Sequence, residues 1–365
     1  MGRARKSAIS MQDQLFEIGN LKTKCKAPFN NLYFSTFGKA GPCWLQVNVT
    51  SDWSHTTSIK DIWNGPEFNK IREDLLNDKF CGKCEICKTN WDDNVWPLAQ
   101  AYDKFGVQGY PEWPSLFELE LSNQCNLECT MCSGYLSSGI RKNRENLPPL
   151  PMMYDQTFVD QLTEFVPHLE EIRFNGGEPF AQKIVLDICD MVAGINPGLK
   201  INIATNGTVY NKRVEKILRQ NNVHLNVSID SLIKERYESI RINANFDQLM
   251  TNFKIFHKYS IDGKKEMAVM VNPMRNNWEE MVDFLKFAND HNINLWYNTI
   301  KYPENLAIWN LDSDKLMEIC DTLSAKLDQY TQSVKHYKFD KDNTSTTKHL
   351  IEQQIKTWLL DSYTR

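Results

Sequence analysis

The chain has 365 residues, with 42 Lys and Arg against 46 Asp and Glu, a formal net charge of −4 and 41% hydrophobic residues. This length leaves room for two or three domains with substantial cores, and ten Trp among 24% charged residues exclude a wholly disordered chain. The balanced charge does not favour a nucleic-acid partner. No apolar run reaches the roughly 18–20 residues that cross a bilayer, and the basic start lacks an apolar segment behind it. We therefore expect a cytoplasmic protein with no membrane partner.

The N-terminal third predicts small, irregular elements. Residues 1–20 are expected to form a loosely held lead, and residues 21–95 are rich in turns, aromatic residues and cysteine. Apolar residues recur at helical spacing from Ser58 to Phe80, and Gly65-Pro66 predicts a break into two short helices. Residues 96–115 contain three prolines that predict a linker.

From 116 to 304 the sequence alternates between strand and helix patterns. The expected strands are Phe117–Leu121, Glu171–Phe174, Lys200–Ala204, His224–Ile229, Glu266–Val271 and Asn294–Thr299. The expected helices lie near 156–166, 181–193, 211–219, 246–259 and 277–289, with Asp155 and either Asn276 or Asn277 as N-caps. This alternation predicts βαβ units and a parallel sheet. The fold class is therefore α/β, a six-stranded partial (β/α)6 barrel rather than a complete eightfold one, followed by a helical extension over 305–365.

Ten cysteines require an explanation. In a reducing compartment cysteines are more often metal ligands or catalytic groups than disulfides. Cys125, Cys129 and Cys132 follow the first expected strand directly. Three thiolates on one loop hold three irons of a 4Fe–4S cube and leave the fourth iron open. Cys189 and Cys320 lie in apolar helical patterns and are expected to be buried hydrophobic residues.

Polar and glycine-rich motifs follow the next three expected strands. They are Asn175 to Pro179, Thr205 to Gly207, and Ser228 to Ser231. Each motif alone is typical of a turn. Because the carboxyl ends of parallel strands meet at one edge of a sheet, we expect all three to converge on the cysteine loop.

The CxxxCxxC triad after one strand and the Gly-Gly-Glu-Pro run after the next resemble the radical S-adenosylmethionine (radical SAM) superfamily. The resemblance covers about residues 116–300. It implies that Cys125, Cys129 and Cys132 hold a 4Fe–4S cluster whose fourth iron is chelated by SAM. Reduction of the cluster then cleaves SAM to methionine and a 5′-deoxyadenosyl radical, which abstracts a substrate hydrogen. The electron donor would be a protein such as flavodoxin or ferredoxin.

The same resemblance implies a set of cofactor-binding residues. They are Met131, Asn175, Gly176, Gly177, Glu178, Pro179, Thr205, Asn206, Ser228 and Asp230. Gly176, Gly177 and Glu178 would meet the methionine amino group, and Ser228 and Asp230 would lie near the ribose or the sulfonium. Met131 stands where many members have an aromatic residue, which implies a looser wall for the adenine. Since the cofactor performs the difficult step, no protein residue is assigned as a general base.

Upstream, Cys25, Gly38 and Cys43 form a CX12GX4C motif, followed by Cys84 and Cys87 as CX2C. This pattern resembles the twitch domain, a shortened SPASM domain in which four cysteines bind one auxiliary 4Fe–4S cluster. The domain usually follows the barrel, whereas here it precedes it. Cys81 competes for one ligand place, and a structural zinc site is the alternative. Whether this cluster has an open iron stays undecided.

Several activities are compatible with this sequence. The first is hydrogen abstraction from a peptide or protein residue, and the second is dehydrogenation or epimerisation of a sugar or aminocyclitol, both by analogy with relatives. A non-catalytic iron–sulfur or zinc scaffold is a third, although the Gly-Gly-Glu-Pro run has no purpose without SAM. The substrate, the net reaction and the oligomeric state are not settled by the sequence.

Overall fold

The computed structural model of the protein describes residues 16–18, 21–47, 52–93, 98–106, 110–333 and 344–363. The expected lead over 1–20 lies outside these residues except for 16–18. The elements before the barrel are β1 (Phe16–Ile18), β2 (Leu21–Thr23), α1 (Ala27–Asn30), β3 (Asn31–Phe34), β4 (Ala40–Gly41), α2 (Ile59–Asn64), α3 (Pro66–Leu76), α4 (Cys84–Asp92) and η2 (Leu98–Tyr102). Gly65 ends α2 and begins α3, as its position before Pro66 predicted.

One eight-stranded sheet organises the molecule, in the order β10-β9-β8-β7-β6-β5-β3-β4. Its barrel strands are β5 (Leu116–Leu119), β6 (Glu171–Phe174), β7 (Lys200–Thr205), β8 (Asn222–Ser228), β9 (Met267–Val271) and β10 (Asn294–Tyr297). These six strands are parallel to their neighbours, and only β4 is antiparallel. The expected α/β partial barrel is confirmed, and all six expected strands are present with ends shifted by one to two residues.

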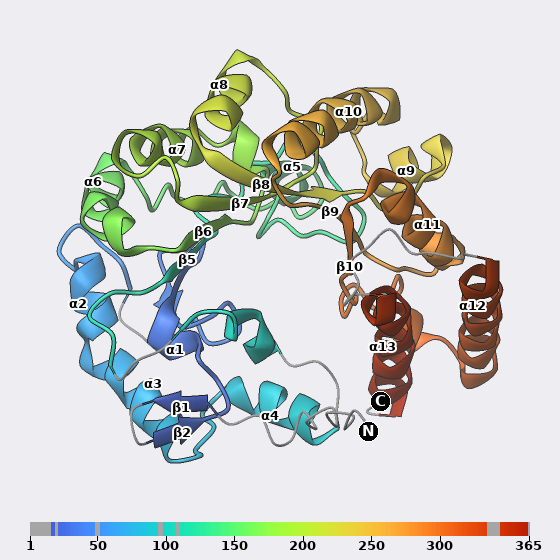
Figure 1. Ribbon diagram of the computed structural model, residues 1–365, viewed down its shortest axis with the longest axis horizontal. Helices are drawn as coiled ribbons and strands as arrows, with labels where there is room; N and C mark the ends of the chain where they lie inside the picture. Colours follow the sequence, from blue (N-terminus) through green and yellow to red (C-terminus); the bar gives the residue numbers. More distant parts are fainter. Residues whose placement is uncertain are drawn as a thin grey trace, which may run out of the picture.

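Helices cover the convex side of the curved sheet (Figure 1). The elements between the strands are α6 (Gln156–Phe165), η3 (Val166–His168), η4 (Pro179–Ala181), α7 (Lys183–Ile195), α8 (Lys212–Gln220), α9 (Lys234–Ile240), α10 (Phe246–Gly263), η5 (Trp278–Glu280) and α11 (Met281–His291). The short helix α5 (Ser138–Asn143) follows the cysteine loop and is drawn inside this ring of helices. Along β7, Ile201 and Ile203 are fully buried, whereas Lys200 and Asn202 are half-buried on the other face. Since successive strand residues alternate between faces, the apolar residues pack under the helices and the polar residues line the concave side.

The cysteine-rich segment joins the barrel through the sheet, which the sequence did not predict. β3 pairs in parallel with β5, with Asn31 opposite Leu116. All four β3 residues are buried, so this strand shows no alternation by which it could be recognised. Phe34 of β3 meets Phe158 of α6 at a ring-centroid distance of 5.1 Å, and Trp53 meets Phe158 at 5.2 Å. The N-terminal segment and the barrel therefore share one hydrophobic core.

The helix caps follow the expectations in one case and differ in the other. The Asp155 carboxylate accepts from the backbone N–H of Thr157 at 2.9 Å and caps α6. The expected side-chain cap near Asn277 is wrong, because α11 is preceded by η5. The Asn277 side chain instead accepts from the Met274 N–H and donates to the Asp230 carbonyl, bracing the loop after β9.

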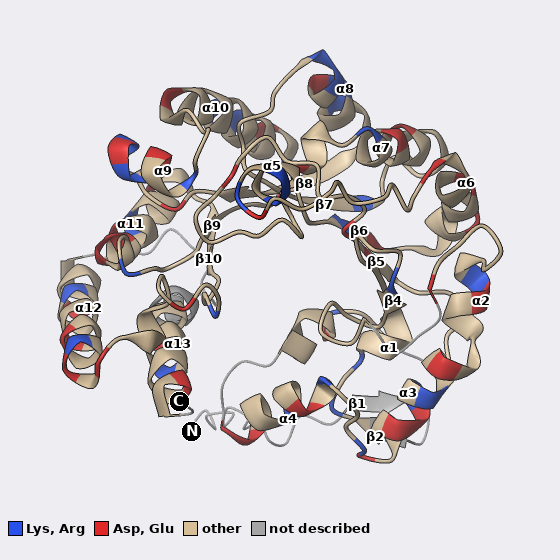
Figure 2. Cartoon of the chain, turned by 180° about the vertical axis from the view of Figure 1, so that it is seen from behind, with Lys and Arg blue, Asp and Glu red and all other residues tan. Residues whose placement is uncertain are grey.

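The C-terminal extension is helical, as expected, with η6 (Ile308–Asn310), α12 (Ser313–Ser333) and α13 (Thr344–Tyr363). α13 packs against β10 and α12, and it lines one cavity together with residues of α4, beside which it lies in Figure 1. Acidic and basic residues are intermixed over the outer helices (Figure 2). Among the helices of the described ranges, none combines the length and hydrophobicity needed to span a membrane.

The shared core predicts that Phe158 couples the two parts of the molecule. Replacing it by Ala (Phe158→Ala) should lower the free energy of unfolding by about 3–5 kcal/mol, because the cavity removes the contacts with Phe34 and Trp53. Urea unfolding followed by tryptophan fluorescence and by circular dichroism should remain one transition with both probes. The control Ile195→Ala, at the exposed end of α7, should change stability by less than about 0.5 kcal/mol. Two separate transitions in the wild-type protein would contradict the common core.

Candidate radical SAM site

The structure brings the three cysteines of the 125–132 loop to the mouth of the barrel. Cys125, Cys129 and Cys132 line a cavity of about 340 Å³, here called the cysteine cavity. Its other walls come from the carboxyl ends of the strands, with Gly176 and Gly177 after β6, Ala204 to Asn206 at the end of β7, Ser228 of β8, Asn272 after β9 and Asn298 after β10. The predicted convergence of loops on one rim is therefore present.

Backbone hydrogen bonds hold the cysteine loop against the segment that follows α9. The Glu128 N–H donates to the Ile242 carbonyl at 3.0 Å, and the Thr130 N–H donates to the Ile240 carbonyl at 2.8 Å. These two bonds bracket Arg241 and place it beside Cys129. Main-chain pairing with residues 240–242 thus adds to the turn within the loop, in which the Cys132 N–H donates to the Cys129 carbonyl at 3.1 Å.

Arg241 is a functional residue that the sequence analysis missed. Its Nη1 lies 3.8 Å from Sγ of Cys129, and its Nη2 lies 2.7 Å from Oδ2 of Asp230. It is the one cation among the described residues that line the cysteine cavity. Its buried Nε has no hydrogen-bond partner within the described part of the chain. A buried guanidinium with one unpaired N–H group is suited to a cavity that binds a negatively charged group.

The thiols of this loop are poor acids without such a partner. Burial raises the pKa of Cys125 to about 12 and that of Cys132 to about 11, and it also raises the pKa of Cys129. The Arg241 guanidinium opposes the rise at Cys129. Metal ions deprotonate the thiols they bind, and soft thiolates suit iron–sulfur ligation. The Leu127 N–H also donates to Sγ of Cys125 at 3.4 Å, which stabilises a thiolate.

The glycines after β6 allow the turn to approach the cysteine loop. Gly176 and Gly177 have φ of 74° and 55°, in the left-handed region that favours glycine. A Cβ at Gly177 would lie 2.4 Å from the carbonyl oxygen of Gln124. The Glu178 N–H donates to this same oxygen at 2.9 Å. The pair of glycines is therefore required by the contact between the turn and the residue before Cys125.

The Glu178 side chain lies behind this turn and is fully buried. One carboxylate oxygen accepts from the Thr205 hydroxyl at 2.8 Å and the Phe180 N–H at 3.1 Å, and the other accepts from the Asn206 N–H at 2.7 Å. Burial raises the pKa of Glu178 to about 7, although these three donors oppose the rise. The carboxylate ties the end of β6 to the end of β7.

Six of the ten expected cofactor-binding residues line the cysteine cavity: Met131, Gly176, Gly177, Thr205, Asn206 and Ser228. The other four lie elsewhere. Glu178 and Pro179 are buried beneath the turn, and Asn175 faces the concave side of the sheet. Asp230 is fully buried, where its carboxylate binds Arg241 and the backbone N–H of Asn272. Asn272 and Asn298 also line the cysteine cavity and directly follow β9 and β10. The rule that ligands gather at the carboxyl ends of parallel strands would therefore have identified both.

The N-terminal cysteines form a second group. Cys25 and Cys43 pack against an apolar cluster that includes Tyr102, and Cys84 and Cys87 lie three residues apart on the first turn of α4. Burial raises the pKa of Cys25, and the thiolates of Cys43, Cys87 and Cys84 raise it further. The four expected ligands are thus close enough to interact electrostatically.

The competing cysteines at this second group lie close together. Burial raises the pKa of Cys84 to about 12, and the neighbouring Cys81 raises it further. Sγ of Cys81 also lies 3.4 Å from Nε2 of the buried Gln46.

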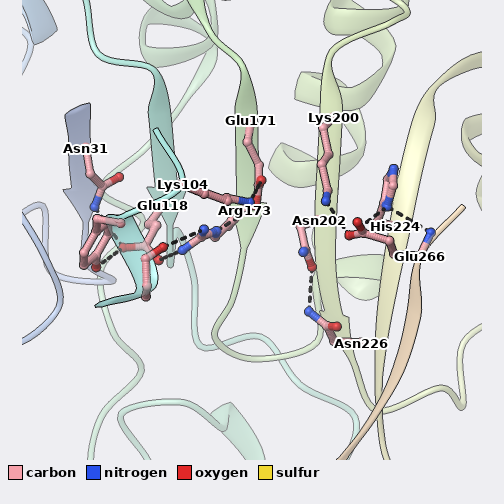
Figure 3. Close-up of polar contacts among 12 residues, drawn as sticks. Asn31, Lys104, Glu118, Glu171, Arg173, Lys200, Asn202, His224, Asn226 and Glu266 are labelled. Carbon is pink, nitrogen blue, oxygen red and sulfur yellow. Dashed lines mark hydrogen bonds and ion pairs between the residues drawn. The ribbon is translucent and has the colours of Figure 1, made fainter. Parts of the chain in front are cut away.

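A second, larger cavity of about 450 Å³ lies on the concave side of the sheet and is here called the lumen cavity. Figure 3 shows its charged and amide side chains projecting from β5 to β9. Asn298 lines both the lumen cavity and the cysteine cavity. Ala101 of η2 lines the lumen cavity and also packs against the apolar cluster that Cys25 and Cys43 contact. The lumen therefore adjoins both cysteine groups.

The buried carboxyl of Glu178 predicts a pH-dependent stability. The folded state holds a proton up to about pH 7 that an ordinary Glu releases near 4.5, so the free energy of unfolding should fall as the pH rises between these values. Urea denaturation of anaerobic, cluster-free protein at several pH values measures this slope. Glu178→Gln should reduce it, whereas Glu170→Gln, at an exposed position, should not. Parallel pH profiles for wild type and Glu178→Gln would contradict the assignment.

Several known proteins are similar to this chain. GTP 3′,8-cyclase from Lactiplantibacillus plantarum is 24% identical over 56% of this chain and 60% of its own length. The mitochondrial GTP 3′,8-cyclase of Arabidopsis thaliana is 24% identical over 65% of this chain and again 60% of its own length. The chain thus spans about three fifths of these curated relatives. Among solved structures, Streptococcus suis SuiB bound to S-adenosylmethionine aligns over 72% of this chain and 58% of its own, with 14% identity and a TM-score of 0.45.

Two family models match successive parts of the chain. The radical SAM superfamily model matches residues 119–288, and the SPASM iron–sulfur cluster-binding model matches residues 25–88. The first contains Cys125, Cys129 and Cys132, and the second contains Cys25, Cys43, Cys84 and Cys87. The chain therefore carries a region similar to the SPASM iron–sulfur cluster-binding domain, followed by a region similar to the radical SAM superfamily.

Proposed function

We propose that this enzyme binds SAM in the cysteine cavity and abstracts a hydrogen atom from a peptide residue or small metabolite held in the lumen cavity. Cys125, Cys129 and Cys132 would hold the SAM-binding 4Fe–4S cluster in the core over 116–304. Cys25, Cys43, Cys84 and Cys87 would hold the auxiliary cluster in the domain over 21–95. When bound and reduced, the first cluster with SAM supplies the hydrogen-abstracting 5′-deoxyadenosyl radical.

The observation that carries this proposal is the arrangement around Arg241. Three thiols on one loop open into a cavity that is closed by the ends of β6, β7 and β8 and contains one lining cation. Nη1 of Arg241 contacts Cys129, while its Nε lacks a partner within the described residues. This guanidinium would offset the charge of the thiolates and bind the carboxylate of SAM.

The protein residues of this rim would orient the cofactor and exclude water. Gly176 and Gly177 bring backbone close to the cavity, and the hydroxyl of Ser228 and the amide of Asn206 face it. Glu178 would position the rim without touching the cofactor, because the three hydrogen bonds that it accepts hold the ends of β6 and β7 together. Asp230 would likewise act through Arg241.

The auxiliary cluster would serve electron transfer or shape the substrate site. Ala101 of η2 lines the lumen cavity and also packs against the apolar cluster that the proposed ligands Cys25 and Cys43 contact. Four cysteine ligands would leave no iron of this cluster open. A flavodoxin or ferredoxin would supply the electron for SAM cleavage.

Replacing Cys129 by Ala should remove the SAM-binding cluster and abolish SAM cleavage. The wild-type protein, reconstituted anaerobically with iron and sulfide, should carry about eight irons per chain and produce 5′-deoxyadenosine with dithionite and SAM. Cys129→Ala should carry about four irons and produce none. The control Cys320→Ala, on α12, should behave as the wild type. Cleavage by Cys129→Ala at the wild-type rate would refute the site.

The auxiliary ligands are tested by comparing two neighbouring cysteines. Cys84→Ala should lose about four irons, because a cluster ligand on α4 is missing, and it should retain part of the SAM cleavage. Cys81→Ala is the matched variant, since its thiol contacts Gln46, and it should keep about eight irons. Iron and sulfide analysis together with Mössbauer spectra measures both. The assignment is reversed if Cys81→Ala loses the cluster and Cys84→Ala keeps it.

A further inference from the structure

The lumen cavity contains charged groups that already neutralise one another. Arg173 lies 2.7 Å from Oε1 of Glu171 and 3.1 Å from Oε1 of Glu118. Lys104 pairs with Glu171, and Lys200 pairs with Glu266. The lining therefore holds three cations and three carboxylates, and every cation has a carboxylate partner (Figure 3).

The two pairs of Arg173 are the least exposed of these ion pairs. The Glu171 side chain is 2% exposed, that of Glu118 is 9% exposed and that of Arg173 is 16% exposed. A phosphate that took Arg173 as its partner would leave Glu171 paired with Lys104, but it would leave the Glu118 carboxylate without a cation among the described residues, which is unfavourable. A polyanionic ligand therefore gains Arg173 only by breaking a buried ion pair.

The amide side chains in the same cavity behave differently, because their hydrogen-bonding groups are largely unused. Nδ2 of Asn226 donates to Oδ1 of Asn202 at 2.6 Å. Within the described part of the chain this leaves Nδ2 of Asn202 as an unused donor and Oδ1 of Asn226 as an unused acceptor. The side-chain amides of Asn175, Asn294 and Asn298 also make no hydrogen bond to described residues, and all five line the cavity.

The strands order these groups along the axis of the barrel. β7 presents Lys200, then Asn202, and then Ala204 at the cysteine cavity. β8 repeats the order with His224 and Asn226 before Ser228 lines the cysteine cavity. In the sheet register Arg173, Asn202 and His224 stand opposite one another on neighbouring strands, so charged groups and the Asn202 amide share one level. Asn226 stands opposite Ala204, one step nearer to the small residues that face the position from which hydrogen would be abstracted.

From this arrangement we propose that the lumen cavity binds an uncharged polar group, through the amides of Asn202 and Asn226, and does not bind a nucleoside triphosphate. This inference rests on the proposed function and names its substrate class. The ligand presents hydroxyls or amides, each of which both donates and accepts hydrogen bonds. Such groups complement free amides without disturbing the ion pairs. The hydroxyls of a sugar and the amides of a peptide residue both provide this chemistry.

The test measures binding of three probes to the reconstituted holoenzyme by saturation-transfer difference NMR. D-glucose presents hydroxyls, N-acetylglycinamide presents amides, and GTP presents a triphosphate. We expect glucose or N-acetylglycinamide to bind, GTP not to displace it, and the double variant Asn202→Leu/Asn226→Leu to bind it about tenfold more weakly. The neutral probe that binds identifies the source of the group.

Two further variants keep the result interpretable. Asn222→Leu alters an amide on the same strand that lies outside the lumen cavity and bonds to Gly198, so it should bind the probe as the wild type does. Asn202→Asp keeps the acceptor for Asn226 but loses the free donor, so it should weaken binding several-fold even if the double variant does not fold.

The proposal is overturned if neither neutral probe binds, if the asparagine variants bind the neutral probe as the wild type does, or if GTP displaces it. Iron content and SAM cleavage of the wild-type preparation are measured separately. A failure of the proposed function appears in those two measurements, whereas a failure of this inference appears only in the binding of the probes.

Discussion

The position of the cysteine loop depends on a short run of main-chain pairing with residues 240–242. The Glu128 and Thr130 N–H groups donate to the carbonyls on either side of Arg241, so the arginine side chain is directed at Cys129. Arg144 adds a second brace by donating to the Cys129 carbonyl at 2.8 Å. Three thiols whose pKa values are raised by desolvation would otherwise resist ionisation. A fixed guanidinium beside them lowers the cost of making thiolates before any metal arrives.

The same loop is also held from the side of β7. The Asn126 amide donates to the Thr208 hydroxyl at 2.8 Å, and the Asn206 amide donates to Oδ1 of Asn126 at 2.9 Å. Asn206 in turn accepts from Thr208. The expected role of Asn206 at the cofactor is therefore combined with a role in supporting the cysteine loop.

The sequence allowed the barrel and its rim to be predicted for a physical reason. Alternation of buried and half-buried residues marks strands such as β7, and the rule that ligands gather at strand ends locates the cysteines and glycines. Arg241 could not be found in this way. It follows α9 rather than a strand, and its neighbours Ile240 and Ile242 carry no motif. Its position depends on pairing with a loop more than a hundred residues away.

The N-terminal segment was harder to predict for a related reason. β3 is only four residues long and buried on both faces, so its pattern does not distinguish strand from buried loop. Its pairing with β5 is specified by side chains distant in sequence. The Glu118 carboxylate accepts from the Asn31 amide at 2.8 Å and from the Tyr102 hydroxyl at 2.7 Å, while Arg173 binds its other oxygen.

Through these contacts Glu118 connects the N-terminal segment to the barrel. One oxygen binds groups that pack beside Cys43, since the Asn31 amide also donates to the Pro42 carbonyl at 2.9 Å. The other oxygen belongs to the ion pairs of the lumen cavity. A carboxylate with two neutral donors and one arginine is satisfied without a ligand. Glu118 therefore joins the N-terminal segment to the barrel at the level that Arg173 and Asn202 share in the sheet, and the amide of Asn226 lies one step nearer to the cysteine loop.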